Sequence, residues 1–270
     1  MTIYLYYFLI FSFFGWMLEV AYAGVRSHRF VNRGFVFGPV CPIYGVCAVM
    51  LRLCLLPLAD RWLLLFLAAF GLATAVELAT GFLMDKIFAT KWWDYSTHRL
   101  NIGGYVCLRF SLYWGVLGAA LVKLAFPVFD FVFQLIPLLV WQITLWTLLA
   151  VLLVDLGLSV AAAFHWRVEL RLLEETRRAL TKGSDTIGKG VYRGTAKLEE
   201  KYHVLSDKSA RLFLRFLDAF PTMRVRGVDI RALRERVARR CKGEVSDATY
   251  VEDATPDGEA GAPMGDDTTI

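Results

Sequence analysis

The sequence predicts an all-α membrane protein with five transmembrane helices, and three observations support this prediction. Hydrophobic residues make up 57% of the 270-residue chain, and its mean hydropathy of +0.48 is typical of integral membrane proteins. Charged residues are sparse up to residue 164 and dense beyond it. Five apolar runs are long enough to cross about 30 Å of hydrocarbon as helices, and they cover residues 3–25, 38–58, 62–84, 105–125 and 137–163. Residues 126–136, bounded by Pro127 and Pro137, are expected to form an interfacial connector or a short sixth helix lying in the interface.

Charge divides the chain into three regions. Residues 1–164, the expected transmembrane domain, hold ten Lys/Arg and seven Asp/Glu. Residues 165–242 hold twenty Lys/Arg and ten Asp/Glu. Apolar residues at helical spacing in this basic region predict short cytosolic helices over 166–180, 191–205, 208–220 and from 229 onward. Residues 243–270 hold eight acids and no Lys or Arg, which predicts a disordered acidic tail.

The Lys and Arg residues of the short loops predict the orientation, because cytosolic loops carry an excess of both. The first and third loops carry three each, the second has only Arg61, and the basic region follows the fifth run. We therefore expect a multi-pass membrane protein with its N-terminus outside and its C-terminus in the cytosol.

The segment from Asn32 to Gly45 interrupts the apolar pattern with three glycines, two prolines and one charge. Proline removes a backbone donor, and glycine permits close backbone approach. At membrane depth, irregular backbone is tolerated only where protein or a water-filled cavity covers it. The segment is therefore either a partly unwound or re-entrant element lining a polar site, which we favour, or an ordinary interfacial loop.

The chain's two asparagines, Asn32 and Asn101, begin similar segments. A glycine-containing turn follows each, and a tyrosine stands twelve residues later, Tyr44 and Tyr113 respectively. The apolar run before each segment carries one glutamate between small residues, which let helices approach closely. The two helical hairpins are either a parallel repeat, to which the fifth helix is added, or a coincidence among residues common in membrane helices.

Three acids lie well inside apolar runs and are the first candidate site residues: Glu19, Glu77 and Asp155. At 1.5 Å per residue, each is expected about 9–14 Å below the cytosolic surface. A charge there is costly unless it is paired or hydrated. Either these acids line a functional site for a cation, a proton or a cationic group, or they fix helix packing by pairing with Arg26, Arg33 or Arg109.

The third loop supplies a second candidate cluster, from Lys91 to Ser96. An aromatic belt at the headgroup level explains its rings but not the polar Asp94 and Ser96. Asp94 either caps the following turn or faces Arg33 and Arg99. If the first and third loops meet, an aromatic-walled polar pocket open to the cytosol results, and its loop and helix-start members are Asn32, Arg33, Tyr44, Trp93, Asp94, Tyr95, Ser96 and Asn101.

No cofactor, metal ion or nucleic acid is expected. The five cysteines contain no C-x-x-C pair, and the loop histidines lack ligand spacing. Residues 183–189 fit the pattern G-x-x-x-x-G-K, but Gly190 stands where a P-loop needs Ser or Thr, and no apolar strand precedes them. The sequence therefore predicts no ATPase within this chain.

Several ordered motifs resemble the CmpB family of bacterial membrane proteins, which are labelled as ABC transporter permeases. The resemblance covers roughly residues 10–160 and rests on Gly15-Trp16, Glu19, Asn32-Arg33-Gly34, Gly38-Pro39, Cys41 to Gly45, Glu77, Trp93 to Ser96 and Asn101 to Gly104. It implies transport, and it brings neither a substrate nor a residue-level mechanism. With no P-loop in the chain, it also implies a separate nucleotide-binding subunit.

The leading hypothesis is a permease-like protein for a small or amphiphilic solute, with a cytosol-facing polar cavity lined by Glu19 and Glu77. The alternative is a membrane-embedded enzyme or lipid-headgroup-binding protein acting at the cytosolic leaflet, with Asp94, Glu19 or Glu77 as acid or base. A third hypothesis is a scaffold whose basic helices recruit a partner.

Overall fold

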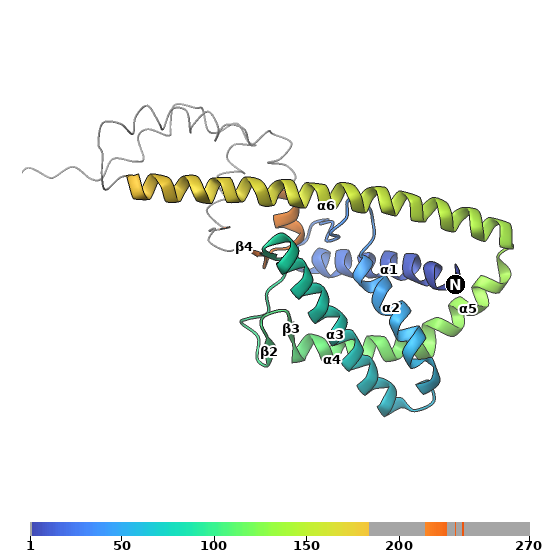
Figure 1. Cartoon of the computed structure of the whole chain (residues 1–270). Helices are drawn as coiled ribbons and strands as arrows, with labels where there is room; N and C mark the ends of the chain where they lie inside the picture. The colour runs from blue at the N-terminus through green and yellow to red at the C-terminus, as the bar shows by residue number, and fades with distance from the viewer. Residues whose placement is uncertain (1, 184–213, 226–229, 231–233, 235–270) are drawn as a thin grey trace, which may run out of the picture.

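The computed structural model describes residues 2–183, 214–225, 230 and 234, and this part of the chain is mainly helical (Figure 1). Its named helices are α1 (Thr2–Ser27), α2 (Pro42–Leu55), the 3-10 helix η1 (Leu56–Leu58), α3 (Trp62–Phe88), α4 (Leu108–Ala120), the π-helix η2 (Leu121–Ala125), α5 (Phe126–Leu135) and α6 (Leu138–Gly183). The described residues also form four two-residue strands, β1 (Thr90–Lys91), β2 (Asn101–Ile102), β3 (Val106–Cys107) and β4 (Arg224–Val225). β1 pairs with β4 and β2 with β3, both antiparallel.

Four helical stretches of the described chain are long and apolar enough to cross a membrane: Thr2–Ser27, Trp62–Phe88, Leu108–Leu135 and Leu138–Val168. They agree with the predicted helical membrane protein. The expected second span is shorter, Pro42–Leu58, because residues 38–41 are not helical. Pro42 occupies the first turn of α2, where its missing N–H leaves no helical hydrogen bond unmade. Five spans therefore stays a prediction.

Residues 126–135 of the expected interfacial connector are helical, because α4 continues through the π-helix into α5, as far as Leu135. This agrees with the short sixth helix that the sequence allowed, and its interfacial position stays a prediction. Pro127 lies in the first turn of α5. A proline inside a helix removes one backbone bond and clashes with the preceding turn, and a π-helix relieves such a clash by changing the local winding. Figure 1 shows α5 turning away from α4 at this point.

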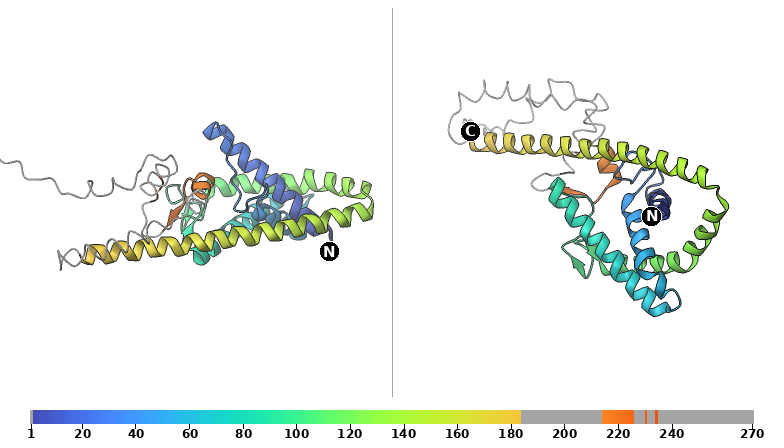
Figure 2. Two further views of the ribbon diagram at one scale, coloured as in Figure 1. Left: turned by 90° about the horizontal axis from the view of Figure 1, so that it is seen from above. Right: turned by 45° about the vertical axis from the view of Figure 1, so that its right-hand side comes forward.

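α6 is continuous across the predicted domain boundary at residues 164 and 165. Its 46 residues correspond to about 69 Å at 1.5 Å per residue. Figures 1 and 2 show it extending well past the ends of α1 and α3. A short helix at 214–219 falls within the predicted helix 208–220. The predicted helix 191–205, most of the one from 229, and the tail 243–270 lie outside the described residues.

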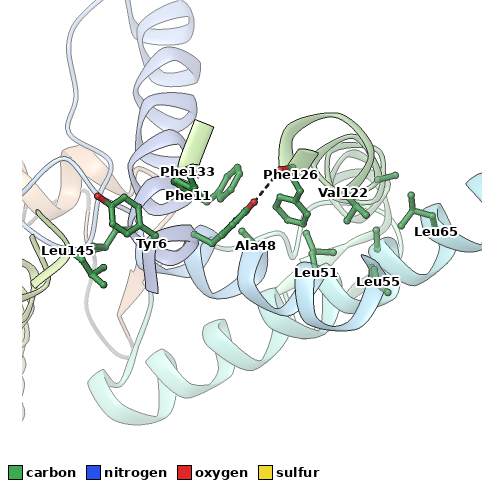
Figure 3. Packing of buried hydrophobic residues seen from close by; sticks show 14 of the residues in the cluster. Tyr6, Phe11, Ala48, Leu51, Leu55, Leu65, Val122, Phe126, Phe133 and Leu145 are labelled. Atoms are coloured by element: carbon green, nitrogen blue, oxygen red, sulfur yellow. Dashed lines mark hydrogen bonds between the residues drawn. The ribbon is translucent and has the colours of Figure 1, made fainter. Parts of the chain in front are cut away.

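The main apolar core lies among α1, α2, α3, α4, the π-helix, α5 and α6. Its most deeply buried side chains include Tyr7, and also Leu51, Phe126 and Leu145, which Figure 3 labels. Glycines permit the tight contact of α1 with α2: a Cβ added at Gly45 would lie 2.2 Å from the Ser12 Oγ. Gly15, one of the small residues that flank Glu19, allows a similar approach, because an added Cβ would lie 2.2 Å from the Tyr44 Cγ.

Candidate functional site

Asn32 organises the irregular segment between α1 and α2. Its Oδ1 accepts hydrogen bonds from the Gly34 N–H at 3.0 Å and from the Trp16 indole at 2.8 Å. Its Nδ2 donates to the Phe37 carbonyl at 2.8 Å. The amide thus satisfies backbone groups that a helix would otherwise pair, and it fixes the segment to α1 through Trp16.

Glu19 of α1 lies beside this segment with both carboxylate oxygens occupied. Oε1 accepts the Tyr44 hydroxyl at 2.6 Å, and Oε2 lies 2.9 Å from the Arg33 Nε. Tyr44 packs directly on α1, since a Cβ at Gly15 would lie 2.2 Å from its Cγ. Glu19 is therefore paired with one of the three arginines considered from the sequence, Arg33.

Glu77 of α3 has different surroundings. The residue is 8% exposed, and its Oε1 accepts the Tyr95 hydroxyl at 3.3 Å. The Trp114 side chain of α4 reaches the same carboxyl. Among the described residues, Glu77 Oε2 has no hydrogen-bond partner. Burial, together with the neighbouring carboxylates, raises the pKa of Tyr95 well above its usual range, so its phenol stays a hydrogen-bond donor.

Contacts between aromatic rings connect the surroundings of the two glutamates. The rings of Tyr44, which bonds to Glu19, and Trp114, which reaches Glu77, meet edge to face with centroids 5.6 Å apart. The Glu19 carboxylate is close enough to act electrostatically on Glu77. The structure therefore brings five residues singled out from the sequence into one polar cluster, and they are Glu19, Arg33, Tyr44, Glu77 and Tyr95.

Asp94 shapes the third loop and has no recorded contact with either glutamate. Its Oδ1 accepts the Ser96 N–H at 2.9 Å, and its Oδ2 accepts the Ser96 hydroxyl at 3.0 Å. Oδ2 also lies 2.6 Å from the Arg224 Nε. Asp94 therefore caps the turn, as one reading of the sequence predicted, and its arginine partner comes from β4. Gly104 packs against the Asp94 carboxylate. Its φ is 76°, and a Cβ there would lie 2.4 Å from Asp94 Oδ1.

Asn101 holds the other half of the third loop. Its Nδ2 donates to the His98 carbonyl at 2.8 Å, and its Oδ1 accepts the Gly104 N–H at 3.1 Å. The Trp93 indole donates to the Tyr105 carbonyl at 2.8 Å. Most of the polar side chains singled out in the third loop thus stabilise the loop itself, and they are Trp93, Asp94, Ser96 and Asn101. Tyr95 instead bonds to a glutamate, Glu77.

Asp155 of α6 binds the opposite side of the irregular segment. Its carboxylate accepts the backbone N–H groups of Phe37 at 2.9 Å and Gly38 at 2.7 Å, and the Ser159 hydroxyl at 3.3 Å. A Cβ at Gly38 would lie 2.8 Å from Asp155 Oδ2, so glycine allows this approach. Asp155 anchors non-helical backbone and has no recorded bond to the glutamate cluster.

The first and third loops meet, and residues 214–225 lie against both. The Phe35 ring packs edge to face on Trp92 at 5.0 Å, and Phe216 contacts both rings at 6.2 and 5.2 Å. Arg215 donates to the Val36 carbonyl, and its guanidinium lies 4.2 Å from the centre of the Phe37 ring. This docking was not predicted from the sequence, because a single short segment carries no periodic signal.

A second polar cluster joins α1, α2 and α5 and was also missed. Asp130 lies 2.9 Å from Arg52 and accepts the Tyr7 hydroxyl at 2.8 Å. The Arg52 guanidinium stacks 4.4 Å from the centre of the Tyr7 ring. The available signal was Arg52 itself, the single cation within the expected second span. Its partner Asp130 lies in residues 126–136, which were expected at the interface and not against the second span.

Within the described residues, no group of three or more His, Cys, Asp or Glu side chains is placed to hold a metal ion. The carboxylates of the site instead face phenols, an indole and arginines, which suits binding of protons or polar organic groups.

Residues 6–160, more than half of the chain, match the family model described as "Putative ABC-transporter type IV", the CmpB family. No curated protein and no solved structure gives a significant match. The family match and the long apolar helices together indicate a multi-pass membrane protein of the transport type. The chain belongs to the CmpB family of ABC-transporter type IV proteins.

Proposed function

We propose that this protein is the membrane component of a transporter for a small or amphiphilic solute, with Glu19 and Glu77 lining a cytosol-facing polar cavity. The protein lies in the bacterial inner membrane with its N-terminus outside and its C-terminus in the cytosol. In this proposal Pro42–Leu58 is a fifth span, and the irregular segment before it completes the crossing. Irregular backbone is tolerated there because Asn32 and Asp155 satisfy its polar groups.

The observation that carries the proposal is the meeting of two carboxylates inside apolar helices. Ionisable residues at such depth are rare and usually serve a pathway or a binding site. Glu19 and Glu77 come from different hairpins, and the ring contact of Tyr44 with Trp114 connects their surroundings. Such an arrangement places a polar site between the two hairpins, where their relative movement would change access to it.

The basic loops lie at the end of the bundle opposite the start of α1, and this supports the proposed orientation. The first and third loops, which carry most of the loop arginines and lysines, gather with residues 214–225 at one end of the bundle (Figure 1). The start of α1 lies at the other end beside the start of α6, where Tyr6 stacks on Trp141 at 4.3 Å. The basic end would face the cytosol.

The family match, with no P-loop in the sequence, supports a separate nucleotide-binding subunit as the energy source. The tagged membrane protein, purified in mild detergent, should retain a P-loop ATPase subunit. Pull-downs that never contain one would contradict an ATP-driven mechanism.

Substitution of Glu77 tests the transport role directly. We expect Glu77→Gln to abolish activity at near-normal expression, measured by an untargeted lipid and metabolite comparison of deletion cells complemented with each variant. Asp60→Asn is the matched control, since Asp60 is 99% exposed in a turn at the far end of the bundle.

Rescue of the deletion profile by Glu77→Gln as fully as by wild type would reject the role of the cluster in transport.

The enzyme alternative predicts a different result, turnover of lipid by the purified protein in detergent with no second compartment. Asp94 is poorly placed for that role, because both its oxygens are bonded to Ser96 and Arg224.

A further inference from the structure

The two glutamates of the cluster differ in what neutralises them. Glu19 lies against Arg33, whereas no lysine, arginine or histidine nitrogen of the described chain forms a salt bridge with Glu77. We infer that Glu77 is the proton-binding group of this membrane site, while the Glu19 carboxylate is held in its ion pair with Arg33. The use of that proton in transport rests on the proposed function. The protonation itself rests on the geometry alone.

Burial is the first support. Glu77 is 8% exposed, and its Oε2 has no partner among the described residues. An ionised carboxylate in such a place lacks both water and a counter-ion, and the usual outcome is that the group stays neutral. Glu19, by contrast, has a cation at 2.9 Å and a phenol at 2.6 Å.

The groups facing Glu77 from neighbouring elements add no positive charge. Tyr95 comes from the third loop and Trp114 from α4. α2 contributes the Cys47 thiol, and α1 contributes the Glu19 carboxylate. The Arg109 Nε donates to the Tyr113 hydroxyl at 3.2 Å. Burial and the negative charge of Glu19 favour the protonated Glu77 carboxyl, whereas donation from Tyr95 and Trp114 favours the ionised form, and burial is the largest of these effects.

The proton gives the cluster two charge states. With Glu77 protonated, Glu19 and Arg33 cancel, and the cluster is neutral. After release of the proton, two carboxylates face one guanidinium, and the cluster carries one net negative charge. This second state accepts one positive charge, so the matching ligand is a solute with a cationic group that exchanges for the proton.

Infrared difference spectroscopy of the purified full-length protein in lipid nanodiscs tests the inference without any transported solute. Between mildly acidic and alkaline pH, wild type should lose the carbonyl band of a protonated carboxyl in an apolar environment. Glu77→Gln should lack that band, and Glu19→Gln should retain it. A band unchanged in Glu77→Gln would overturn the inference, as would its loss only in Glu19→Gln.

Thermal unfolding in the same nanodiscs gives an independent reading. The folded state would hold a proton that the unfolded chain releases, so stability should fall as pH rises through the titration of Glu77. Glu77→Gln should flatten this dependence and keep wild-type stability at neutral pH. Glu19→Gln should be less stable, because it leaves Arg33 without its carboxylate. Equal pH dependence in wild type and Glu77→Gln would contradict the inference.

Discussion

Gly45 shows how one missing side chain positions the site. It lies next to Tyr44, whose hydroxyl reaches Glu19, and it lets α2 approach the Phe8 carbonyl and Ser12 of α1. The Glu19–Tyr44 contact therefore depends on backbone proximity as much as on the two polar groups. Small residues at helix interfaces serve this purpose in membranes, where dispersion contacts replace the hydrophobic effect between helices.

Gly45→Ala tests this dependence. The added Cβ would lie 2.2 Å from the Ser12 Oγ and 2.3 Å from the Phe8 carbonyl, so α1 and α2 must separate. We expect a loss of about 1–3 kcal/mol in the free energy of unfolding, typical of overpacking. The control is Gly71→Ala in α3, where nothing lies within 4 Å. There the higher helix propensity of alanine should leave stability unchanged or raise it by up to about 1 kcal/mol.

For single residues, the sequence identified the important polar side chains but not the partners to which they bond. Glu19, Glu77 and the two asparagines were identifiable because polar residues stand out against apolar runs. Trp114 was not, because indole rings in membrane proteins are usually explained by the headgroup layer. The partner of Asp94 was beyond reach, since Arg224 lies 130 residues further along the chain.

Among the elements, α5 departs most from expectation. Two prolines predicted breaks in the chain. The helix does end before Pro137, but at Pro127 it continues because a π-helix takes up the distortion. The resulting turn brings Asp130 to Arg52 and Tyr7, so α5 is fastened to α1 and α2 by polar contacts. Hydrophobic patterning alone could not separate an interfacial connector from a kinked helix, because both are apolar and contain proline.

A double-mutant cycle tests this fastening. Arg52→Met should leave Asp130 without its cation and cost about 1–3 kcal/mol, less than the 3–5 kcal/mol of a fully buried pair, since Asp130 is 32% exposed. The double variant Arg52→Met/Asp130→Leu should lose less than the sum of the single variants. Chemical denaturation in detergent measures each free energy of unfolding. Strict additivity would show that the pair does not hold α5.

For the whole molecule, the docking of residues 214–225 is the feature that links distant parts. Arg215 contacts the first loop, β4 pairs with β1, and Phe216 packs on Trp92. Asp155 holds the same first loop from α6. Burial lowers the pKa of Arg215, and the negative charge of Asp155 offsets part of this effect. Because burial removes part of the guanidinium from water, the backbone carbonyls to which it donates stabilise its charge. The loops next to the glutamates are thus positioned from both sides.

Hydrogen exchange can measure this positioning. Arg215→Met removes charge-assisted bonds worth about 1.5–3 kcal/mol each, so the backbone N–H groups of Phe37 and Gly38 should exchange at least about tenfold faster. Arg234→Met is the control, because Arg234 pairs with Asp218 at the surface and is 44% exposed. Equal exchange in both variants would show that Asp155 alone holds the loop.

Residues 214–225 contact the two loops through ring packing, a two-residue strand pair and arginine bonds, and they belong to the same chain as the helices that these loops join. A covalent tether gives such a short piece a high effective concentration at its docking surface. Cutting the chain between α6 and residue 214 should therefore weaken this docking even though every contact partner is still present.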